Sequence, residues 1–179
     1  MNINYIIQCR MTSERFPGKV LAPFLKKPLL DHVVQQIKKT NIYSSIILAT
    51  STDNTDNPLA SYAKNLGLKL VRGSLDDVVE RYALALDSYN CDAFFRVCGD
   101  SPLLLPNLFD HAVSIYKNKP YDIITNTFPR TYPVGMSVEL IKSEIFLKTE
   151  KNIIYKDERE HLSKHFYKNF KSFQIHNIE

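Results

Sequence analysis

The chain is short of cysteine and of long apolar runs, and each shortage argues against a class of protein. Its three cysteines, Cys9, Cys91 and Cys98, form no C-x-x-C pair. This argues against a disulfide framework or a zinc site and predicts a reducing, cytoplasmic location. No apolar run approaches the about 18 residues that a membrane span needs. The first residues do not join a basic segment to an apolar core, so no secretory signal is expected.

Two common phosphate-binding motifs are also absent. Gly18-Lys19 is followed by Val20 rather than Ser or Thr, and position 13 is Ser rather than Gly, so this is not a P-loop of the Walker type. The sequence contains no G-x-G-x-x-G, so the dinucleotide-binding fingerprint is missing as well. A phosphate site in this chain must therefore be built in another way.

What is present is the composition of one globular domain. The chain has 179 residues, of which 44% are hydrophobic and 23% charged, with a formal net charge of +4. This length and apolar content suffice for a single core. The positive excess is mild, and acidic residues are mixed with the basic ones. We therefore expect a small anionic ligand rather than nucleic acid.

Apolar strand-like runs alternate with segments of helical periodicity through residue 126. The predicted strands are 3–9, 45–51, 68–71, 93–98 and 121–126, and the predicted helices are 28–39, 59–65, a helix capped by Ser74, and 106–116. Regular alternation of this kind predicts an α/β fold, a mostly parallel sheet with helices on both faces and right-handed crossovers. Beyond it we predict a long loop at 127–135, a strand at 136–141, helices at 144–149 and 157–170, and a strand at 173–178.

A cationic loop follows the first predicted strand. It carries Arg10, Arg15 and Lys19 together with the hydroxyls of Thr12 and Ser13. In open α/β sheets ligands bind at the carboxyl ends of strands, and arginine, lysine and backbone N–H groups are the usual ligands of a polyphosphate. The loop therefore predicts a phosphate site. A solvated basic loop with no ligand is the alternative.

Gly99-Asp100-Ser101-Pro102 follows the fourth predicted strand. A carboxylate at the end of a strand can hold a Mg²⁺ ion that also binds phosphates. An aspartate that simply opens a turn is the alternative. The fold could place this strand beside the first one, which would bring Asp100 close to the cationic loop.

Two further groups of polar residues are candidates for weaker reasons. His161 and His165 are four residues apart, and Glu158 and His161 have the i, i+3 spacing of a di-iron ligand pair. That motif is needed twice and occurs once, so we do not expect metal on this helix. A polar helix face and a substrate-facing His161 with Arg159 are the remaining interpretations. The second group, which flanks the aromatic loop and could contact a hydroxylated, acidic substrate, consists of Asn126, Arg130 and Glu139.

With these residues, the sequence resembles the cytidylyltransferases of the acylneuraminate and 3-deoxy-manno-octulosonate type. It is most similar to their spore coat polysaccharide biosynthesis protein F branch. The matching stretches are Arg10-x-x-Ser13-x-Arg15-x-Pro17-Gly18-Lys19, Lys27-Pro28-Leu29-Leu30, Ala49-Thr50-Ser51, Arg72-Gly73-Ser74-x-Asp76-Asp77-Val78, Gly99-Asp100-x-Pro102-Leu103, Asn126-Thr127-x-Pro129-Arg130 and Arg159-Glu160-His161. They occur in the order of the family and cover nearly the whole chain. The resemblance implies a Rossmann-like nucleotidyltransferase fold, CTP as donor and a sugar or sugar acid as acceptor.

The resemblance also assigns roles to residues. It implies that Arg10, Ser13, Arg15 and Lys19 hold the triphosphate, that Asp100 binds Mg²⁺, and that Gly73, Ser74 and Asp77 lie near the nucleoside. It implies that the loop at 126–132 and the turn at 159–161 face the acceptor. With Glu139, the expected acceptor-binding residues are Asn126, Arg130, Tyr132, Glu139, Arg159 and His161. The expected catalytic residues are Arg10, Lys19 and Asp100.

The sequence also departs from the family. Pro133-Val134-Gly135-Met136-Ser137 stands where the branch has Pro-Asp-Gly-x-Asp, Cys9 stands where relatives outside the branch often have Ala, and the chain stops at Glu179. The family continues to an aspartate that is its second metal ligand and to a final helix, so we expect a single domain over 1–179 without that element.

The resulting expectation is transfer of CMP to a nonulosonic-acid-like acceptor, with release of pyrophosphate, in surface polysaccharide biosynthesis. The alternatives are a non-catalytic nucleotide-binding domain and a sugar-phosphate nucleotidyltransferase that uses another nucleotide. The chain could form a homodimer, and we expect no nucleic acid or membrane partner.

Overall fold

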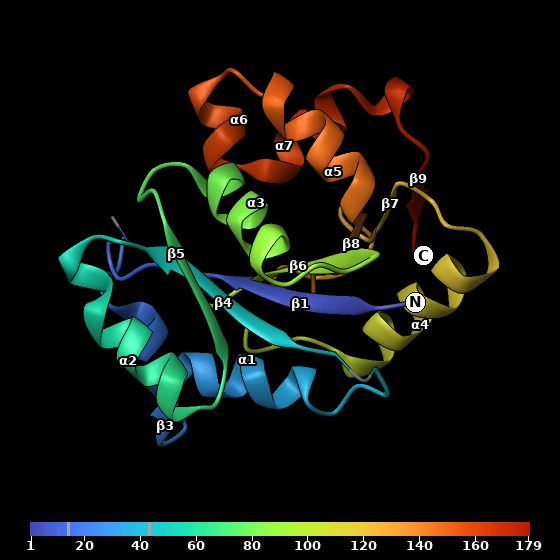
Figure 1. Ribbon diagram of the computed structural model, residues 1–179. Helices are drawn as coiled ribbons and strands as arrows, with labels where there is room; N and C mark the ends of the chain where they lie inside the picture. Colours follow the sequence, from blue (N-terminus) through green and yellow to red (C-terminus); the bar gives the residue numbers. More distant parts are fainter. Residues whose placement is uncertain (14, 43) are drawn as a thin grey trace.

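A mixed sheet runs through the middle of the molecule, with strand order β5-β4-β1-β6-β8-β7-β9 (Figure 1). The computed structural model describes residues 1–13, 15–42 and 44–179, and in these ranges the sheet has seven strands. They are β1 (Ile3–Gln8), β4 (Ile46–Ser51), β5 (Lys69–Gly73), β6 (Ala93–Cys98), β7 (Ile123–Thr125), β8 (Glu139–Lys142) and β9 (Ile175–Asn177). A separate short hairpin, β2 (Pro23–Phe24) with β3 (Lys27–Pro28), was not predicted.

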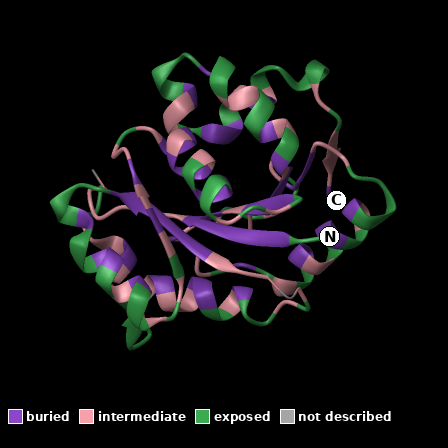
Figure 2. Ribbon diagram, viewed as in Figure 1, coloured by how far each residue is buried: buried purple, intermediate pink, exposed green. Residues whose placement is uncertain are grey.

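Helices cover both faces of this sheet, as the sequence predicts. One layer holds α1 (Leu29–Ile37), α2 (Asn57–Asn65) and α4 (Pro106–Asn118), and the other holds α3 (Val78–Ser88), α5 (Ser143–Thr149), α6 (Lys156–Glu160) and α7 (Leu162–Lys168) (Figure 1). Buried residues lie along the strands and on the inner sides of the helices (Figure 2). None of the helices in the described part is both long enough and apolar enough to cross a bilayer.

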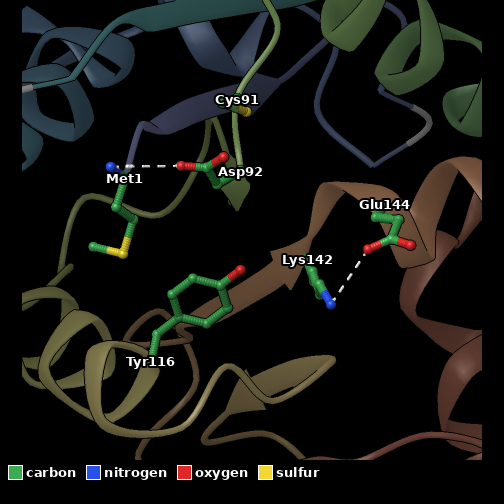
Figure 3. Close-up of a pocket in the computed structure, with 6 residues that line it drawn as sticks. All are labelled: Met1, Cys91, Asp92, Tyr116, Lys142 and Glu144. Carbon is green, nitrogen blue, oxygen red and sulfur yellow. Dashed lines mark ion pairs between the residues drawn. The ribbon is translucent and has the colours of Figure 1, made fainter.

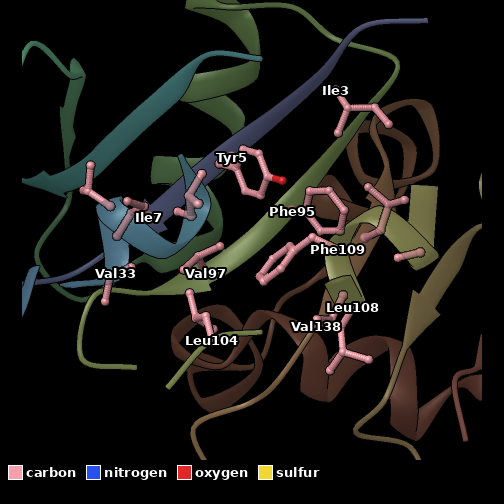
Figure 4. Close-up of a cluster of buried hydrophobic side chains, with 14 of the residues drawn as sticks. Ile3, Tyr5, Ile7, Val33, Phe95, Val97, Leu104, Leu108, Phe109 and Val138 are labelled. Carbon is pink, nitrogen blue, oxygen red and sulfur yellow. The ribbon is translucent and has the colours of Figure 1, made fainter. Parts of the chain in front are cut away.

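Aromatic packing between the sheet and α4 holds the central strands β1 and β6 together. The rings of Tyr5 and Phe95 stack with their centroids 4.9 Å apart, and Phe109 of α4 packs against both at 5.5 and 4.9 Å (Figure 4). All three side chains are essentially inaccessible to solvent. Since aromatic pairs at these separations add to the energy of burial, the two strands form a firm base for the loops at their ends.

The strand order reverses between β1 and β6. β1 pairs in parallel with β4 on one side and with β6 on the other, and the chain visits β4 and β5 before it returns to β6. Such a reversal is the place where open α/β sheets bind ligands, because the loops on either side diverge there. The prediction that the first and fourth predicted strands lie side by side is confirmed.

The predicted alternation of strands and helices through residue 126 does not account for β8, which is inserted into the sheet. β8 lies between β6 and β7 and is antiparallel to both, with Phe95 opposite Leu140 and Ile124 also opposite Leu140. β7 therefore runs in the same direction as β6 but does not touch it. The sequence could not show this, because an apolar strand buried on both faces looks the same whichever neighbour it pairs with.

Two predicted helix boundaries are wrong. The helix predicted over 157–170 is broken at His161, whose φ of −117° and ψ of 76° are not helical, so His161 and His165 do not share a helix. The helix predicted to be capped by Ser74 is capped by Asp77 instead, whose carboxylate accepts from the Glu80 amide at 2.8 Å. Ser74 Oγ accepts from the Asp77 amide at 3.2 Å and stabilises the turn that precedes the helix.

Candidate functional site

A cavity of about 640 Å³ opens where β1 and β6 end, and we call it the cationic pocket. The four residues predicted to hold a triphosphate all line it, and so does Asp100: they are Arg10, Ser13, Arg15, Lys19 and Asp100. His161 and Glu160 lie on its wall as well. The volume lies in the range of about 300–1,000 Å³ that is typical of small-molecule sites.

A second cavity of about 390 Å³ adjoins the first, and we call it the side pocket. The residues on its outer wall come from β8, from the loop after β7 and from α7, and include Thr127, Arg130, Gly135, Ser137, Glu139 and Tyr167. Arg96, Cys98 and Asp100 line both cavities. The two cavities thus share one wall, which is built from β6 and the turn after it.

A third hollow lies at the other end of the strands. It is lined by Met1, Cys91, Asp92, Tyr116, Lys142 and Glu144 (Figure 3). Its charges pair with each other, the terminal amine with Asp92 at 3.7 Å and Lys142 with Glu144 at 3.4 Å (Figure 3). None of the residues predicted for the site lines it, so it is not a candidate for that site.

The cationic loop folds back on the carbonyl of Met11, which accepts from the amide of Ser13 at 3.0 Å and from that of Gly18 at 2.8 Å. Gly18 has a φ of 72°, a conformation that costs glycine little and other residues more. A 3₁₀ turn, Lys19–Leu21, follows directly. The turn at Gly18 therefore directs Lys19 back toward the strand ends. Glu14, in the same loop, lies outside the described residues.

A buried carboxylate ties this loop to the neighbouring strand. Asp56 is inaccessible to solvent and accepts from the amide of Met11 at 2.6 Å, from Thr50 Oγ1 at 2.9 Å, from the Ser51 amide at 3.1 Å and from the Ser51 hydroxyl. The sequence by itself assigned no role to Asp56. Nothing in the local sequence separates it from Asp53, which has the same side chain and only caps a short turn.

Gly99 allows β1 and β6 to approach each other at their ends. A Cβ atom at this position would lie 2.7 Å from Cys9 Cβ and 2.9 Å from Cys9 Sγ. The atoms that crowd this position belong to the protein itself. Cys9 packs in the core, and burial raises the pKa of its thiol, as expected for a cysteine that serves as small apolar packing.

Acidic side chains pair with two of the loop's cations. Lys19 forms an ion pair with Asp100, and Arg10 donates to Glu160 at 3.0 Å. Among the described residues, the charged ones that line the cationic pocket are four cations, Arg10, Arg15, Lys19 and Arg96, and two carboxylates, Asp100 and Glu160. The pocket therefore keeps a positive excess, which suits an anionic ligand.

The residues predicted to lie near a nucleoside form a loop beside the cationic pocket, but they do not line it. Arg81 is buried and holds this loop by donating to the carbonyls of Ser74 at 2.7 Å and Leu75 at 2.9 Å. Arg10 reaches the same Leu75 carbonyl at 3.3 Å. Gly73 packs against Leu84 and Arg81, and a Cβ atom added there would lie 2.9 Å from Leu84 Cδ1 and 3.2 Å from Arg81 Cγ. The loop is thus held at the edge of the pocket.

Asp77 and Arg159 pair with each other. The guanidinium Nε of Arg159 donates to Asp77 Oδ2 at 2.5 Å, and its Nη1 donates to the carbonyls of Glu150 and Ile153 at 3.2 and 2.9 Å. The resemblance places Asp77 near the nucleoside and Arg159 near the acceptor. In the folded chain the pair joins α3 to α6, and neither residue lines the two cavities described above.

The predicted acceptor residues are distributed over several places. Arg130 and Glu139 line the side pocket, and Arg130 also donates to Ser137 Oγ at 3.2 Å. His161 lines the cationic pocket. Tyr132 packs against the core beneath the α4 layer. Arg130, Glu139 and His161 are therefore the predicted acceptor residues that face a cavity.

Asn126 is buried and bonded to backbone. Its amide nitrogen donates to the Met136 carbonyl at 2.8 Å, and its amide oxygen accepts from Val138 N at 2.9 Å. These bonds fasten the start of the loop at 127–137 to its end. Asn126 therefore holds in place the loop whose residues line the side pocket.

Sequence reasoning missed a buried network at the junction of the two pockets. Arg96 Nη1 donates to Glu139 Oε2 at 2.5 Å, and Tyr167 donates to Glu139 Oε1 at 2.6 Å. Tyr167 also bonds to the hydroxyls of Thr125 and Thr127 at 3.0 and 2.9 Å. An arginine inside an apolar strand was the available signal, since arginine is rarely buried without a partner.

The network also sets the protonation of its members. Burial by itself lowers the pKa of Arg96, but Glu139 together with Cys98 and Tyr82 outweighs it, so the pKa of Arg96 is raised. Burial by itself raises the pKa of Glu139, but Arg96 and the hydroxyl donors outweigh it, so the pKa of Glu139 is lowered. Both groups therefore remain charged at neutral pH.

The carboxylate of Glu158 pairs with basic side chains of α7. Glu158 is buried and accepts from His165 Nδ1 at 2.6 Å and from Lys168 Nζ at 2.8 Å. The pKa of Glu158 is lowered, first by Lys168 and then by His165. Among the residues that the structure describes, no group of three His, Cys, Asp or Glu side chains could hold a metal ion.

A doubly wound sheet, with a cationic loop and a carboxylate side by side at its reversal point, defines an α/β protein of the nucleotidyltransferase class. The family model for cytidylyltransferases matches residues 4–177. The chain belongs to this cytidylyltransferase family of enzymes, and both the predicted resemblance and the predicted fold are confirmed.

Individual relatives agree with this assignment. The chain is 30% identical to the uncharacterised protein MJ1063 of Methanocaldococcus jannaschii, over 100% of this chain and 72% of the relative. It is 28% identical to the spore coat polysaccharide biosynthesis protein SpsF of Bacillus subtilis, over 90% of this chain and 68% of the relative. The 3-deoxy-manno-octulosonate cytidylyltransferase of Geobacter sulfurreducens is 30% identical, but the match covers only 47% of that enzyme.

Solved structures give the same fold. A cytidylyltransferase from Leptospira borgpetersenii superposes with a TM-score of 0.93 at 29% identity, covering 99% of this chain and 76% of that one. A CMP:2-keto-3-deoxy-manno-octonic acid synthetase solved with CTP superposes with a TM-score of 0.76 at 14% identity, covering 100% and 90%. At that identity the second likeness concerns the fold alone.

Proposed function

We propose that this chain transfers CMP from CTP to a hydroxyl of a sugar or sugar acid, nonulosonic-acid-like in character, and releases pyrophosphate. The observation that carries this proposal is the wall common to the two pockets. A triphosphate in the cationic pocket and an acceptor in the side pocket would meet at Asp100 and Arg96. The names of the relatives support a polysaccharide pathway and a sugar acid as acceptor.

The reaction needs positioning and charge neutralisation more than covalent help from the protein. The acceptor oxygen attacks the α-phosphorus from the side pocket and forms the new P–O bond. The bond from that phosphorus to the bridging oxygen breaks, pyrophosphate leaves with the electron pair, and the acceptor's proton passes to solvent. Arg10, Arg15 and Lys19 would hold the departing charge, because they line the cationic pocket and not the side pocket.

Asp100 is the residue that would hold a Mg²⁺ ion. Mg²⁺ in proteins commonly takes one or two carboxylates and completes its shell with phosphate oxygens and water. A single carboxylate beside the phosphate-binding cations fits that pattern. When bound, the ion would polarise the phosphate under attack. Lys19, which pairs with Asp100, would also bind the triphosphate.

Two other functions remain as alternatives for the same site. A non-catalytic nucleotide-binding domain is favoured by Val134 and Ser137, which replace two carboxylates of the branch. Val134 is 81% exposed, and Ser137 bonds to Arg130 at 3.2 Å. A sugar-phosphate nucleotidyltransferase would keep the fold and change the base.

A thermal-shift panel with CTP, UTP, ATP and GTP, each with and without Mg²⁺, tests the nucleotide. Ligand at about 100 times its Kd adds about 2.7 kcal/mol of stability, which raises Tm by about 5–10 °C for a chain of this size. We expect the largest shift with CTP and Mg²⁺. No shift with any nucleotide contradicts the proposal, and a larger shift with another base favours the sugar-phosphate alternative.

Pyrophosphate release tests the catalytic assignment. Lys19→Ala and Asp100→Asn should each lower the rate at least ~100-fold, because each removes an electrostatic stabiliser at the reacting phosphate. Lys148→Ala is the matched control, since Lys148 is exposed on α5 and pairs only with Glu144 among the described residues. Turnover at the wild-type rate in either site variant rejects these roles. Nucleotide binding without any pyrophosphate release favours the non-catalytic alternative.

A further inference from the structure

Arg96 is the residue at the junction of the two pockets to which neither the sequence nor the family resemblance gave a role. It projects from β6 two residues before the strand ends, with 16% of its side chain exposed, and it lines both cavities. A mostly buried guanidinium must be compensated by acceptors. Its surroundings therefore show what it is placed to bind.

The protein occupies only part of this guanidinium. Among the described residues, the guanidinium of Arg96 donates one hydrogen bond, from Nη1 to Glu139. Nε is a buried atom and finds no acceptor in the described part of the chain. Since Nε–H and one Nη2–H point in the same direction, this edge of the group is a two-pronged donor. Such an edge matches the two oxygens of a carboxylate.

The supports of Arg96 lie on the side of the acceptor. Glu139, which pairs with the guanidinium, and Tyr167, which donates to Glu139, line the side pocket and not the cationic pocket. The cations predicted to hold the triphosphate come from the loop after β1. A phosphate and a carboxylate offer Arg96 similar oxygens, but this arrangement favours an anion that arrives from the side pocket.

We propose that Arg96, oriented by Glu139, binds an acceptor carboxylate adjacent to the attacking hydroxyl and so selects sugar acids over neutral sugars. The inference rests on the proposed function and adds to it the residue that sets acceptor specificity. A carboxylate next to the hydroxyl that attacks must lie near the junction of the pockets, because the bond to phosphorus forms there. Arg96 is then a specificity-determining residue, and Glu139 is its positioning residue.

The test uses 3-deoxy-manno-octulosonate, N-acetylneuraminate, their carboxamides and neutral hexoses as probe acceptors, with the intact chain, CTP and Mg²⁺. Acceptor binding is measured by thermal shift and turnover by pyrophosphate release. For Arg96→Lys, which keeps the charge and its pair with Glu139 but loses the two-pronged edge, we expect the KM for the acid to rise about 10- to 100-fold. The Kd for CTP should stay within about 3-fold, and the preference for acid over carboxamide should fall by the factor seen in KM.

Arg72→Lys is the matched control. Arg72 lies on β5, donates to the carbonyls of Ser51 and Asp53 at 2.7 and 3.0 Å, and lines neither pocket. Its replacement should leave the acid preference unchanged even where Tm falls. Arg96→Met combined with Glu139→Leu removes both buried charges together, so a folded variant without acid preference is expected even if Arg96→Met alone fails to fold.

The outcomes separate the two proposals. A wild-type protein that binds CTP but neither shifts with the acids nor prefers them to their carboxamides overturns the role of Arg96 and leaves the nucleotide site standing. An equal loss of CTP and acceptor affinity in Arg96→Lys also overturns it, because the residue would then bind phosphate. A protein that binds no nucleotide contradicts the proposed function itself, and the acid shift measured without CTP then decides whether Arg96 holds a carboxylate.

Discussion

The carboxylate of Asp56 accepts a hydrogen bond of 2.6 Å from the backbone amide of Met11, so a buried charge fixes the start of the cationic loop. The same carboxylate is held by Thr50 and Ser51 at the end of β4. The position of the loop therefore depends on a residue that does not touch the cationic pocket. Because charge-assisted bonds of this kind are among the stronger ones, Asp56 should govern both folding stability and ligand affinity.

Asp56→Asn should destabilise the protein and weaken CTP binding together. An amide cannot accept from the two backbone amides and two hydroxyls that surround this position, and its NH₂ group would face other donors. Leaving such groups unsatisfied costs at least about 2 kcal/mol, which lowers Tm by about 4–8 °C. Calorimetric melting and a CTP titration measure the two effects.

Asp53→Asn is the control, since the bonds of Asp53 to Thr55 are exposed and local. Equal effects in both variants would contradict the role assigned to Asp56.

Glu160→Gln should strengthen CTP binding. Arg10 pairs with Glu160 at 3.0 Å, and a triphosphate must compete for this guanidinium. Since the side chains are 29% and 37% exposed, the pair is worth about 0–1 kcal/mol, and we expect a gain of about 2- to 5-fold in Kd. Isothermal titration at low salt measures it. Glu144→Gln, which changes an exposed carboxylate on α5, should leave the affinity unchanged. Unchanged affinity in Glu160→Gln would contradict the competition between the triphosphate and Glu160 for Arg10.

Gly99→Ala should force the ends of β1 and β6 apart. The added Cβ would lie 2.7 Å from Cys9 Cβ and 2.9 Å from its sulfur, closer than side-chain atoms approach. We expect a loss of about 1–3 kcal/mol from overpacking, with weaker CTP binding. Urea unfolding and nucleotide titration report the two losses. Cys9→Gly combined with Gly99→Ala should recover part of both, because it removes the opposing atoms. A double variant no better than Gly99→Ala would show that another contact causes the damage.

The Arg96–Glu139 pair should make stability depend on pH in the acid range. Burial alone would raise the pKa of Glu139, but the combined effect of Arg96 and the hydroxyl donors is larger and lowers it. The pKa in the folded protein therefore lies below the 4.5 that is usual for a glutamate in the unfolded chain. Its contribution is therefore fully present above about pH 4.5 and is lost as the pH falls through the lower folded value. Urea unfolding between about pH 3 and pH 7 should show a smaller pH dependence in Glu139→Gln than in the wild type. Parallel curves for the two proteins would contradict this assignment.

The sequence alone determined the layers of the fold and the position of the loop. Strands buried on both faces must be continuously apolar, so β1, β4 and β6 appeared directly in the sequence, and amphipathic spacing marked α1 and α4. Because parallel strands present their carboxyl ends at one edge of the sheet, the order of the elements was enough to place Arg10, Lys19 and Asp100 at the same edge.

Tertiary structure alone decided which side chains meet. The insertion of β8 between β6 and β7 places Glu139 beside Arg96, 43 residues away in the chain. Asp77 and Arg159, 82 residues apart, bind each other. The physical reason is that a carboxylate or guanidinium has the same local signature whether it faces solvent, a ligand or another charge. Only the packing of distant segments sets its partner, its burial and hence its role.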